Sequence, residues 1–595
     1  MLEYCWINDN SMFNKQNVNF GGKYFFEYNE TEKVLYPRLN KNYIENFFLL
    51  SEAFKNQPTQ SNCKINVTAI VGENGSGKTT LLDCIRGILK GDVQGIEFIL
   101  VFLENDEYTL VHNKSEEIII DKFDYKLLPY YYFLIKMKSA FVSTIFDRKI
   151  EHGNHRELNL STNYLLNNLN RGSYETDKIR RNLTFLIAKN LKFVNDKNSV
   201  FINNEVALGS EGLEINLRDT SWIYNNEEIE NRTHLNPDVT PFEDQLRKIV
   251  ASNELTLFKK NLLMDISMYI LENAKNWKEL RGPKNARAFQ MQEYINIINP
   301  LRRIKSVDDI QEINEAFSDI IKSFKGYKNF VRKLKDIKNV LEFLFNHVTE
   351  DNLLTEESIV LKKSNEIFEF LNKYNRSIIN GEYFNFSWRR LSTGEETIID
   401  IFSRIYQISK KVKSRMWGDS IVLIIDELES NLHPFWQKHI LKALLSLIEE
   451  GFSSKSVHLI ITSHSPFVIS ELPHNNVVLL EKMNSKSVIQ NHIEDLELTF
   501  AANIHTILAH NFFLKDGVLG EFARGKINGL YNFILNEDIS TLKKYKEDIE
   551  KLIYIISEPL IRNKILSVWS SKMKLNVYDE IEELKKRIAI LEKGE

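Results

Sequence analysis

The chain has 595 residues, of which only 23 are glycine and 11 are proline, which excludes collagen-like, linker-rich and low-complexity architectures. Its 77 basic and 81 acidic residues leave a net charge of -4, too balanced for a protein that coats nucleic acid without specificity. The three cysteines are scattered, and we find neither a leader-like N-terminus nor an apolar run long enough to cross a membrane. We therefore expect a cytoplasmic protein without a membrane partner.

Short strand-forming runs separated by turns occupy about the first 60 residues and predict an antiparallel meander. The apolar run from Ile65 to Val71 predicts a buried strand, followed by a glycine loop and a helix from Lys78 to Leu89. Further strand-like runs lie at Ile96–Leu103, Thr109–His112, Glu117–Ile120 and Ala140–Phe146. Residues 1–150 therefore predict the first lobe of an α/β domain.

Residues 151–388 are polar and predict a mostly helical insertion. From Ile310 to Leu344, apolar residues recur at spacings of three and four, as in a helix with a coiled-coil seam. We predict one long helix, either packed against its neighbours or projecting as a coiled-coil arm. The segments Thr240–Leu280 and Glu356–Ile379 predict further amphipathic helices.

Strands separated by helices return in residues 389–490 and predict βαβ units with a parallel sheet. The predicted helices are Leu391–Ile408 and Pro434–Glu449, and the predicted strands are Ile421–Ile425, His458–Thr462 and Val477–Leu480. Residues 491–595 predict a helical C-terminal region.

The loop after the first buried strand matches the phosphate-binding pattern G-x-x-x-x-G-K-[ST]. Its glycines let successive backbone N–H groups point at phosphate oxygens, and the following helix adds its partial positive charge. Lys78 would reach the β- and γ-phosphates of ATP, and Thr79 would ligate Mg²⁺. The predicted nucleotide-binding residues here are Gly72, Asn74, Gly75, Ser76, Gly77, Lys78, Thr79 and Thr80.

Two carboxylates, Asp426 and Glu427, follow the predicted strand Ile421–Ile425. They would lie at the C-terminal edge of a parallel sheet, where such sheets bind ligands. Asp426 would hold Mg²⁺ through a water, and Glu427 would orient and deprotonate the attacking water. The alternative, a strand that merely ends in solvated acids, is disfavoured by the upstream phosphate loop.

The segment from Leu391 to Glu396, LSTGEE, begins a predicted helix. Ser392 and Glu395 have the spacing of a capping box, which is a purely structural role. The same hydroxyl, the Gly394 backbone and the helix dipole would also form a second phosphate cradle from Ser392, Gly394 and Glu395. We expect this cradle to serve a partner chain's nucleotide.

His464 directly follows the predicted strand His458–Thr462. A lone histidine is usually a satisfied polar group, but this one stands at a strand's C-terminal end, one strand after the carboxylate pair. We predict that it contacts the γ-phosphate and that Glu427, Lys78 and His464 form the catalytic set.

In this order, the phosphate loop, LSTGEE, LIIDE and TSHSP resemble the P-loop, signature, Walker B and switch histidine of the ABC-type ATPase superfamily. The run from Asp426 to Pro434 is similar to the DE-x-E-x-x-LHP pattern of OLD-like and RecF-like AAA ATPases. Transporter ATPases match less well, because their P-loop and signature lie far closer than the roughly 310 residues found here. The family's Q-loop glutamine is not evident, and Ser143–Asp147 is the best candidate for its position. The resemblance implies an ABC-type P-loop ATPase head whose lobes are residues 1–150 and 389–490.

The segment Ile504–Ala523 narrows the resemblance. Its FF and GVLGEFA runs resemble a stretch of stand-alone bacterial ATPases encoded beside HNH endonucleases, the PtuA subunits of Septu-type antiphage systems and of some retrons. A helix–turn–helix that uses Gly517 and Gly520 as stops is the alternative. OLD nucleases add a TOPRIM domain, but here Glu494, Asp495 and Glu497 form only an isolated acidic cluster. Neither an HNH constellation nor a C-x-x-C zinc hook occurs, so we expect no nuclease site in the chain itself.

The resemblance implies ATP and Mg²⁺ as cofactors, a homodimer or higher homo-oligomer with shared ATP sites, and a PtuB-like HNH endonuclease partner. Each shared site would combine Lys78, Thr79, Asp426, Glu427 and His464 of one chain with Ser392 and Gly394 of the other. The alternative is a RecF/SMC-like DNA-repair or DNA-sensing clamp. Its DNA would contact the basic pairs Arg180–Arg181, Arg302–Arg303 and Arg389–Arg390.

Overall fold

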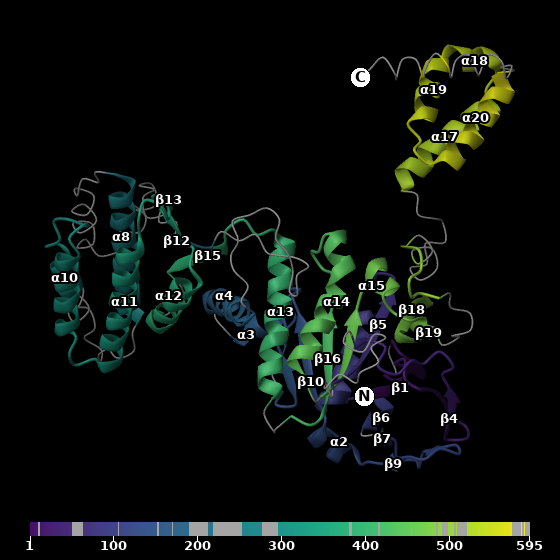
Figure 1. The fold of residues 1–595 in the computed structure, drawn as a ribbon, viewed down its shortest axis with the longest axis horizontal. Helices are drawn as coiled ribbons and strands as arrows, with labels where there is room; N and C mark the ends of the chain where they lie inside the picture. Colours follow the sequence, from purple (N-terminus) through teal and green to yellow (C-terminus); the bar gives the residue numbers. More distant parts are fainter. Residues whose placement is uncertain are drawn as a thin grey trace, which may run out of the picture. The chain divides into compact units, whose positions relative to one another are not determined.

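The computed structural model describes most of the chain (Figure 1). The described residues are 1–9, 12–49, 63–104, 106–151, 154–168, 171–189, 212–217, 253–276, 295–379, 383–413, 417–453, 455–483, 486–490, 498–504, 507, 520–573, 585 and 588. They belong to two compact units. One comprises Met1–Ile507 with Asn511–Phe513, and the other comprises Leu508–His510 with Leu514–Glu595.

A seven-stranded sheet forms the centre of the first unit, in the order β11-β10-β16-β17-β5-β18-β19. The strands are β5 (Lys64–Gly72), β10 (Lys138–Ser143), β11 (Glu157–Asn159), β16 (Ser420–Asp426), β17 (Ser456–Thr462), β18 (Val477–Met483) and β19 (Lys486–Gln490). All neighbours are parallel except β18 and β19. The predicted parallel sheet is confirmed, and the C-terminal ends of β10, β16, β17 and β5 meet at one edge.

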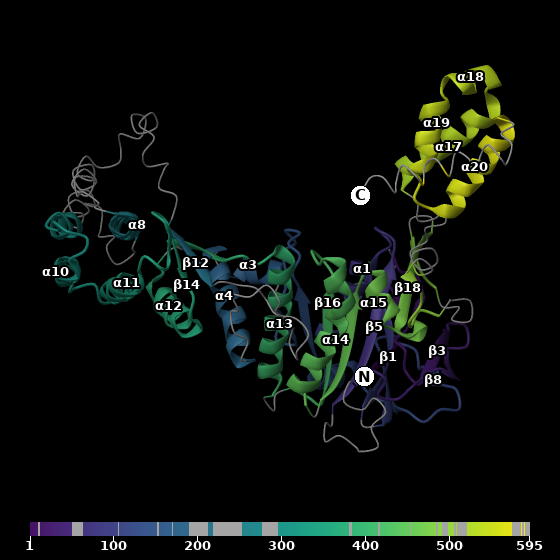
Figure 2. The same ribbon diagram turned by 45° about the horizontal axis from the view of Figure 1, so that its top comes forward.

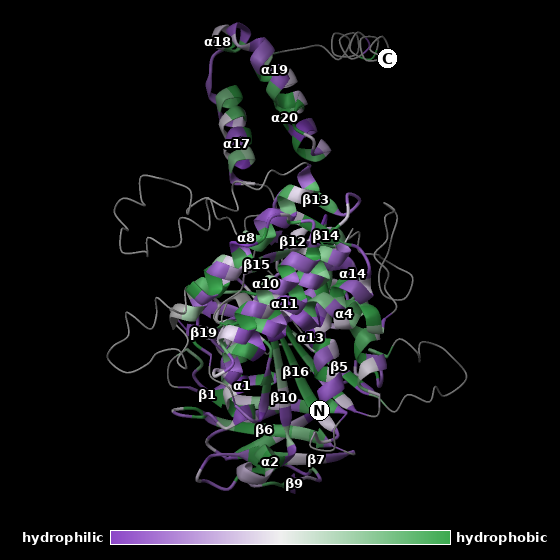
Figure 3. Ribbon diagram, turned by 90° about the vertical axis from the view of Figure 1, so that its left-hand side faces the viewer, coloured by the Kyte–Doolittle hydropathy of each residue, from purple (hydrophilic) through white to green (hydrophobic). Residues whose placement is uncertain are grey.

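Both faces of this sheet are buried, which explains the continuous apolar runs of its strands. Leu423 and Ile425 face a core that includes residues of α13 (Thr393–Val412) and α14 (Pro434–Gly451). Val422 and Ile424 face a second core that includes α1 (Lys78–Lys90). Figure 3 shows the central strands mostly in the hydrophobic colour.

A mostly antiparallel five-stranded sheet completes the second core, in the order β2-β1-β6-β7-β9. Its strands are β1 (Leu2–Asn8), β2 (Gln16–Asn19), β6 (Glu97–Glu104), β7 (Glu107–His112) and β9 (Lys126–Leu127). A three-stranded sheet of β3 (Tyr24–Asn29), β4 (Val34–Leu39) and β8 (Ile119–Ile120) packs on its far side. The predicted antiparallel meander is therefore divided, because β1 pairs with β2 in one sheet and β3 pairs with β4 in the other.

The prediction of one continuous helix from Ile310 to Leu344 is wrong. Helix α10 (Ile310–Ser323) and helix α11 (Lys328–His347) are separated by a turn at residues 324–327. The two helices lie side by side (Figures 1 and 2). The turn is part of the core, because Phe324 is buried and its ring lies 5.1 Å from that of Phe330. Folding back in this way lets both halves of the apolar seam enter one core.

The insertion also contains a four-stranded sheet that the helical pattern did not predict. Its order is β13-β14-β12-β15, from β12 (Leu213–Leu217), β13 (Leu353–Thr355), β14 (Ser358–Leu361) and β15 (Phe384–Trp388). The predicted helix Glu356–Ile379 is wrong over its first part, which is β14, and only Ser364–Ser377 forms helix α12. Within Thr240–Leu280 the structure describes α8 (Glu254–Asn276), and the rest lies outside the described residues.

Several further helices belong to the first unit. They are α2 (Tyr130–Lys136), α3 (Thr162–Asn168), α4 (Arg171–Ala188), α15 (Pro466–Ser470) and the 3₁₀ turn His474–Asn476. In the second unit, α17 (Glu521–Asn536), α18 (Ile539–Lys544), α19 (Lys546–Tyr554) and α20 (Pro559–Met573) bury a core of their own around Ile534 and Trp569. Across the described ranges, we find no helix of the length and hydrophobicity that a membrane crossing requires.

Candidate active site

The glycine loop lies between the end of β5 and the start of α1. Gly75 and Gly77 have φ values of +76° and +95°, a left-handed conformation that side chains disfavour, so the curl of this loop requires glycine. Gly77 is the N-cap of α1 and no side chain caps the helix, which leaves its first N–H groups for a ligand. Strand β19, two strands from β5, supports the loop, because Ser487 Oγ donates a hydrogen bond of 2.5 Å to the Ser76 carbonyl.

Lys78 is buried in this loop, and its ammonium donates hydrogen bonds to the carbonyls of Gly72 and Glu73 at 3.0 and 2.9 Å. Burial lowers the pKa of Lys78, while the nearby carboxylates of Glu427, Glu429 and Asp426 oppose that shift. The lysine and the Walker B acids are thus close enough to share one electrostatic environment. The nucleotide cradle and the acids predicted from separate motifs come together at one sheet edge.

Asp426 is the last residue of β16, and Glu427 begins the following loop with a left-handed φ of +46°. Both are held by Thr462 at the end of β17. The Thr462 hydroxyl donates to Asp426 Oδ1 at 2.6 Å and accepts from the Glu427 N–H at 2.7 Å. Burial raises the pKa of Asp426, and the Thr462 hydrogen bond opposes that rise. Ser430 Oγ also donates to Glu427 Oε2 at 2.7 Å.

His464 lies two residues beyond Thr462 and is half-buried. Its pKa is lowered, first by burial and then by the Lys78 ammonium, while Glu427 acts in the opposite direction. Its backbone N–H donates to Glu429 Oε1. Lys78, Glu427 and His464, the predicted catalytic set, therefore lie within electrostatic reach of one another at the same edge of the sheet. Thr462 and Glu429 were not among the predicted site residues, although Glu429 belongs to the DE-x-E pattern.

The signature segment starts α13 with the predicted capping box. The Ser392 hydroxyl accepts from the Glu395 N–H at 3.3 Å, and the Ser392 N–H donates to Glu395 Oε2 at 2.8 Å. Gly394 packs on the loop after Walker B, where an added Cβ would lie 3.1 Å from the Asn431 carbonyl. Helix α13 contacts β10, and two strands separate β10 from the P-loop strand β5. This lateral offset agrees with a signature that does not serve the chain's own P-loop.

The candidate Q-loop segment follows β10, and Ser143 is in register with Asp426. The fully buried Arg404 of α13 donates to the Ser143 carbonyl at 2.6 Å and pairs with Asp400 at 2.5 Å. Arg181 also pairs with Asp400, at 3.2 Å, and these cations hold the pKa of Asp400 at about 2 against the effect of burial. Arg181 is thereby removed from any exposed basic groove.

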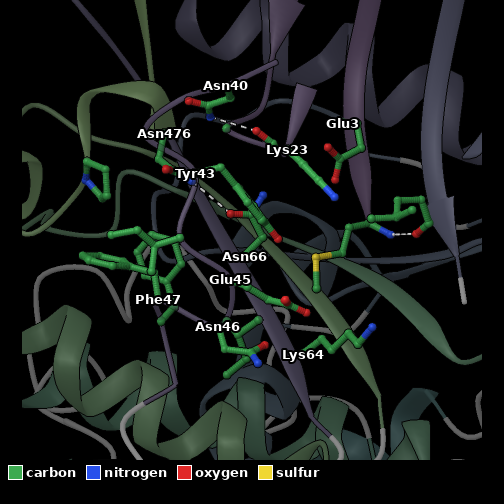
Figure 4. Close-up of a pocket in the computed structure, with 18 of the residues that line it drawn as sticks. Glu3, Lys23, Asn40, Tyr43, Glu45, Asn46, Phe47, Lys64, Asn66 and Asn476 are labelled. Atoms are coloured by element: carbon green, nitrogen blue, oxygen red, sulfur yellow. Dashed lines mark hydrogen bonds between the residues drawn. The ribbon is translucent and has the colours of Figure 1, made fainter. Parts of the chain in front are cut away.

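A cavity of about 1150 Å³ lies at the opposite edge of the sheet, at the N-terminal ends of β5 and β17 (Figure 4). Its lining includes Glu3, Tyr43, Lys64 and Asn66. Burial raises the pKa of Glu3 to about 7. Because the phosphate loop emerges from the other end of β5, this cavity is separate from the nucleotide cradle.

The residues at the C-terminal edge fit a magnesium–nucleotide complex. The loop offers left-handed glycines and an uncapped helix N-terminus to phosphate oxygens. Asp426 and the exposed Thr79 at the start of α1 offer the hard oxygen ligands that Mg²⁺ prefers. When bound there, Mg²⁺ would neutralise charge on the phosphates.

The parallel sheet carries a glycine loop and a buried lysine after one strand, and a carboxylate pair after a strand two positions away. This arrangement defines a P-loop ATPase. Residues 38–469 match the AAA ATPase domain family, which is more than half of the chain. The chain belongs to this family, and it is an ATPase.

Two curated relatives share parts of the sequence. The chain is 34% identical over 195 residues to the Retron Ec83 probable ATPase of Escherichia coli, an alignment covering 30% of this chain and 34% of that protein. It is 31% identical over 98 residues to the Retron Vc95 probable ATPase of Vibrio cholerae serotype O1 biovar El Tor, covering 16% of this chain and 18% of that protein. The chain thus spans about a third or less of the length of these relatives.

Proposed function

We propose that this chain is the ATP-binding and hydrolysing subunit of a bacterial antiphage defence complex in the cytoplasm. Its nucleotide state would control a separate HNH-type nuclease partner, a PtuB-like subunit, which cleaves nucleic acid. The ATP-hydrolysing part of this proposal is supported by one observation. Four predicted site residues meet at one edge of the sheet, namely Lys78, Asp426, Glu427 and His464. The similarity to two retron ATPases supports the defence role.

In this proposal two protomers, or a higher homo-oligomer, share their ATP sites head to tail. Lys78 and the loop N–H groups bind the phosphates, and Thr79 and Asp426 hold Mg²⁺. Glu427 orients the attacking water and takes its proton, and His464 contacts the γ-phosphate. Ser392, Gly394 and Glu395 of the second protomer complete the site. The offset of α13 from β5 supports this trans arrangement.

Co-purification from the native operon tests the proposal. We expect the chain to carry an HNH protein with it, and the mass of the complex to change between ATP-free and ATP-saturated samples. The Lys78→Ala variant is the control, because it should bind the same partner yet show no ATP-dependent change. Co-purification with a DNA-repair protein, or with DNA alone, would instead favour the RecF/SMC-like clamp.

The DNA-clamp alternative receives less support from the basic pairs. Arg181 is buried in its pair with Asp400, and the exposed Arg303 lies 3.3 Å from Asp319. Arg181 is therefore not available to DNA, whereas Arg303 stays at the surface, and the clamp stays the second proposal.

A further inference from the structure

The C-terminal ends of β16 and β17 are joined by two contacts that run in opposite directions. Thr462 ends β17 and holds the acids that follow β16, through its bonds to the Asp426 carboxylate and the Glu427 N–H. Glu429 follows β16 and holds the segment after β17, by accepting the His464 N–H. Each strand end therefore positions the proposed catalytic residue of the other.

The two contacts are shielded from water. Thr462 is 1% exposed and Glu429 is 9% exposed. A hydrogen bond in such surroundings is electrostatically stronger than one in water, and a buried polar group left without its partner is unfavourable. Side chains that are buried and bonded in this way have little freedom to move.

The backbone of Glu427 has a particular need for such support. Its left-handed φ of +46° is unfavourable for a residue with a side chain, so surrounding contacts must hold it. The Thr462 hydroxyl accepts a hydrogen bond from the Glu427 N–H. Ser430 Oγ, in the same loop, donates a hydrogen bond to the Glu427 carboxylate. Together these two hydrogen bonds hold the backbone and the carboxylate of Glu427 in place.

We infer that Thr462 and Glu429 are positioning residues for ATP hydrolysis that do not touch ATP. Thr462 acts through Glu427 and the proposed Mg²⁺ ligand Asp426, and Glu429 acts through His464. This inference rests on the roles proposed for Glu427 and His464. The reciprocal arrangement means that the water-orienting carboxylate and the histidine at the γ-phosphate are held in one rigid unit. A change in the position of either strand end moves both residues together.

The first experiment removes the Thr462 hydroxyl and keeps its shape. In the full-length chain, Thr462→Val should lower kcat at least about tenfold while KM for ATP changes less than about threefold, and the Mg²⁺ concentration for half-maximal rate should rise. Thr462→Ser keeps the hydroxyl and should stay within about threefold of the wild-type kcat. If Thr462→Val is unfolded by thermal denaturation, Thr462→Ala serves in its place.

Thr68 offers a matched control. It is a fully buried threonine on the adjacent strand β5, and its hydroxyl donates to the Phe20 carbonyl at 3.0 Å, away from the acids. Thr68→Val should lower the melting temperature without moving the Mg²⁺ dependence. If Thr462→Val behaves like Thr68→Val, with normal kcat and Mg²⁺ dependence, the inference is overturned.

A second experiment tests whether Thr462 acts through Glu427. In a Glu427→Gln background, single-turnover hydrolysis should fall less than about threefold further when Thr462→Val is added, because residues acting as a unit are not additive. A further tenfold loss would contradict this. If Lys78→Ala and Glu427→Gln both leave hydrolysis intact, the proposed site itself fails. If they abolish it and Thr462→Val does not reduce it, only the inference fails.

The role of Glu429 is tested with a separate pair of variants. Glu429→Gln keeps an oxygen that can accept the His464 N–H and should retain kcat within about threefold, whereas Glu429→Leu loses the acceptor and should lower kcat at least about tenfold. KM for ATP should change little in either variant. Equal kcat values for the two folded variants would remove Glu429 from the proposal.

Discussion

Glu427 is the residue on which the proposed hydrolysis depends most. Its carboxylate is held by Ser430, and its backbone by Thr462, beside the buried Lys78. A carboxylate so fixed can orient a water and accept its proton, whereas an amide of the same shape can only orient it.

We therefore predict that Glu427→Gln binds ATP with near-normal affinity but hydrolyses it about 10²–10⁴ times more slowly. Calorimetric titration of ATP and a phosphate-release assay measure the two effects. Lys78→Ala is the contrasting variant, because it should lose ATP binding itself. Normal turnover by Glu427→Gln would exclude Glu427 as the base.

Two buried titratable groups make the free energy of unfolding change with pH in opposite directions. Burial lowers the pKa of His458 to about 3, so below its ordinary value of 6.5 the unfolded chain binds a proton that the folded chain rejects. The free energy of unfolding then falls as the pH falls. Burial raises the pKa of Glu3 to about 7, so above 4.5 the unfolded chain releases a proton that the folded chain keeps. Here the free energy of unfolding falls as the pH rises.

Between about pH 4.5 and 6.5 these two slopes, each up to about 1.4 kcal/mol per pH unit, largely cancel. We predict that Glu3→Gln makes stability rise with pH across this window, and that His458→Gln makes it fall. Denaturant unfolding at several pH values measures both slopes. Parallel curves for the two variants would contradict the assignment.

At the scale of elements, the start of α13 combines two roles in one residue. Ser392 caps the helix, and it is also the proposed ligand for a partner's phosphate. These roles can be separated, because aspartate is as good an N-cap as serine but repels phosphate.

We predict that Ser392→Ala lowers the free energy of unfolding by about 1 kcal/mol, whereas Ser392→Asp keeps it near that of the wild type. ATP-dependent association, measured by native mass, should be lost in Ser392→Asp despite its stable fold. Normal association of that variant would remove Ser392 from the trans site.

Several helices and strands lie where the sequence patterns predict them. The strands β5, β16, β17 and β18 and the helices α1, α13 and α14 follow their predicted ranges closely, because each is a strong apolar run or amphipathic stretch with its own start signal. The helix predicted over Ile310–Leu344 failed, because periodicity cannot distinguish one long helix from two that share a seam. Strand β12 pairs with β15, far along the chain, so no local signal announces it.

At the scale of the whole molecule, the chain consists of two compact units with separate cores. The core of the second unit is small, and Trp569, 2% exposed, is its largest buried side chain. Losing that ring would remove much of the apolar burial available to this unit.

We predict that Trp569→Ala costs the second unit about 3–5 kcal/mol and unfolds it, while ATP hydrolysis by the first unit stays within about twofold of the wild type. Calorimetry should show a lower or missing transition for the second unit and an unchanged one for the first. A large loss of hydrolysis would show instead that the ATPase depends on the second unit.

The amino-acid sequence was sufficient to predict the chemistry of a P-loop ATPase, because a phosphate loop and a Walker B strand are short local patterns whose residues act from fixed places on a strand and the loop after it. It also determined the parallel sheet, through apolar runs that only burial on both faces explains. The residues that support this chemistry became evident from the three-dimensional fold. Thr462 and Glu429 meet their partners across the neighbouring strands β16 and β17, and Ser487 reaches the phosphate loop from two strands away. Such pairs depend on strand order, which sequence spacing does not encode.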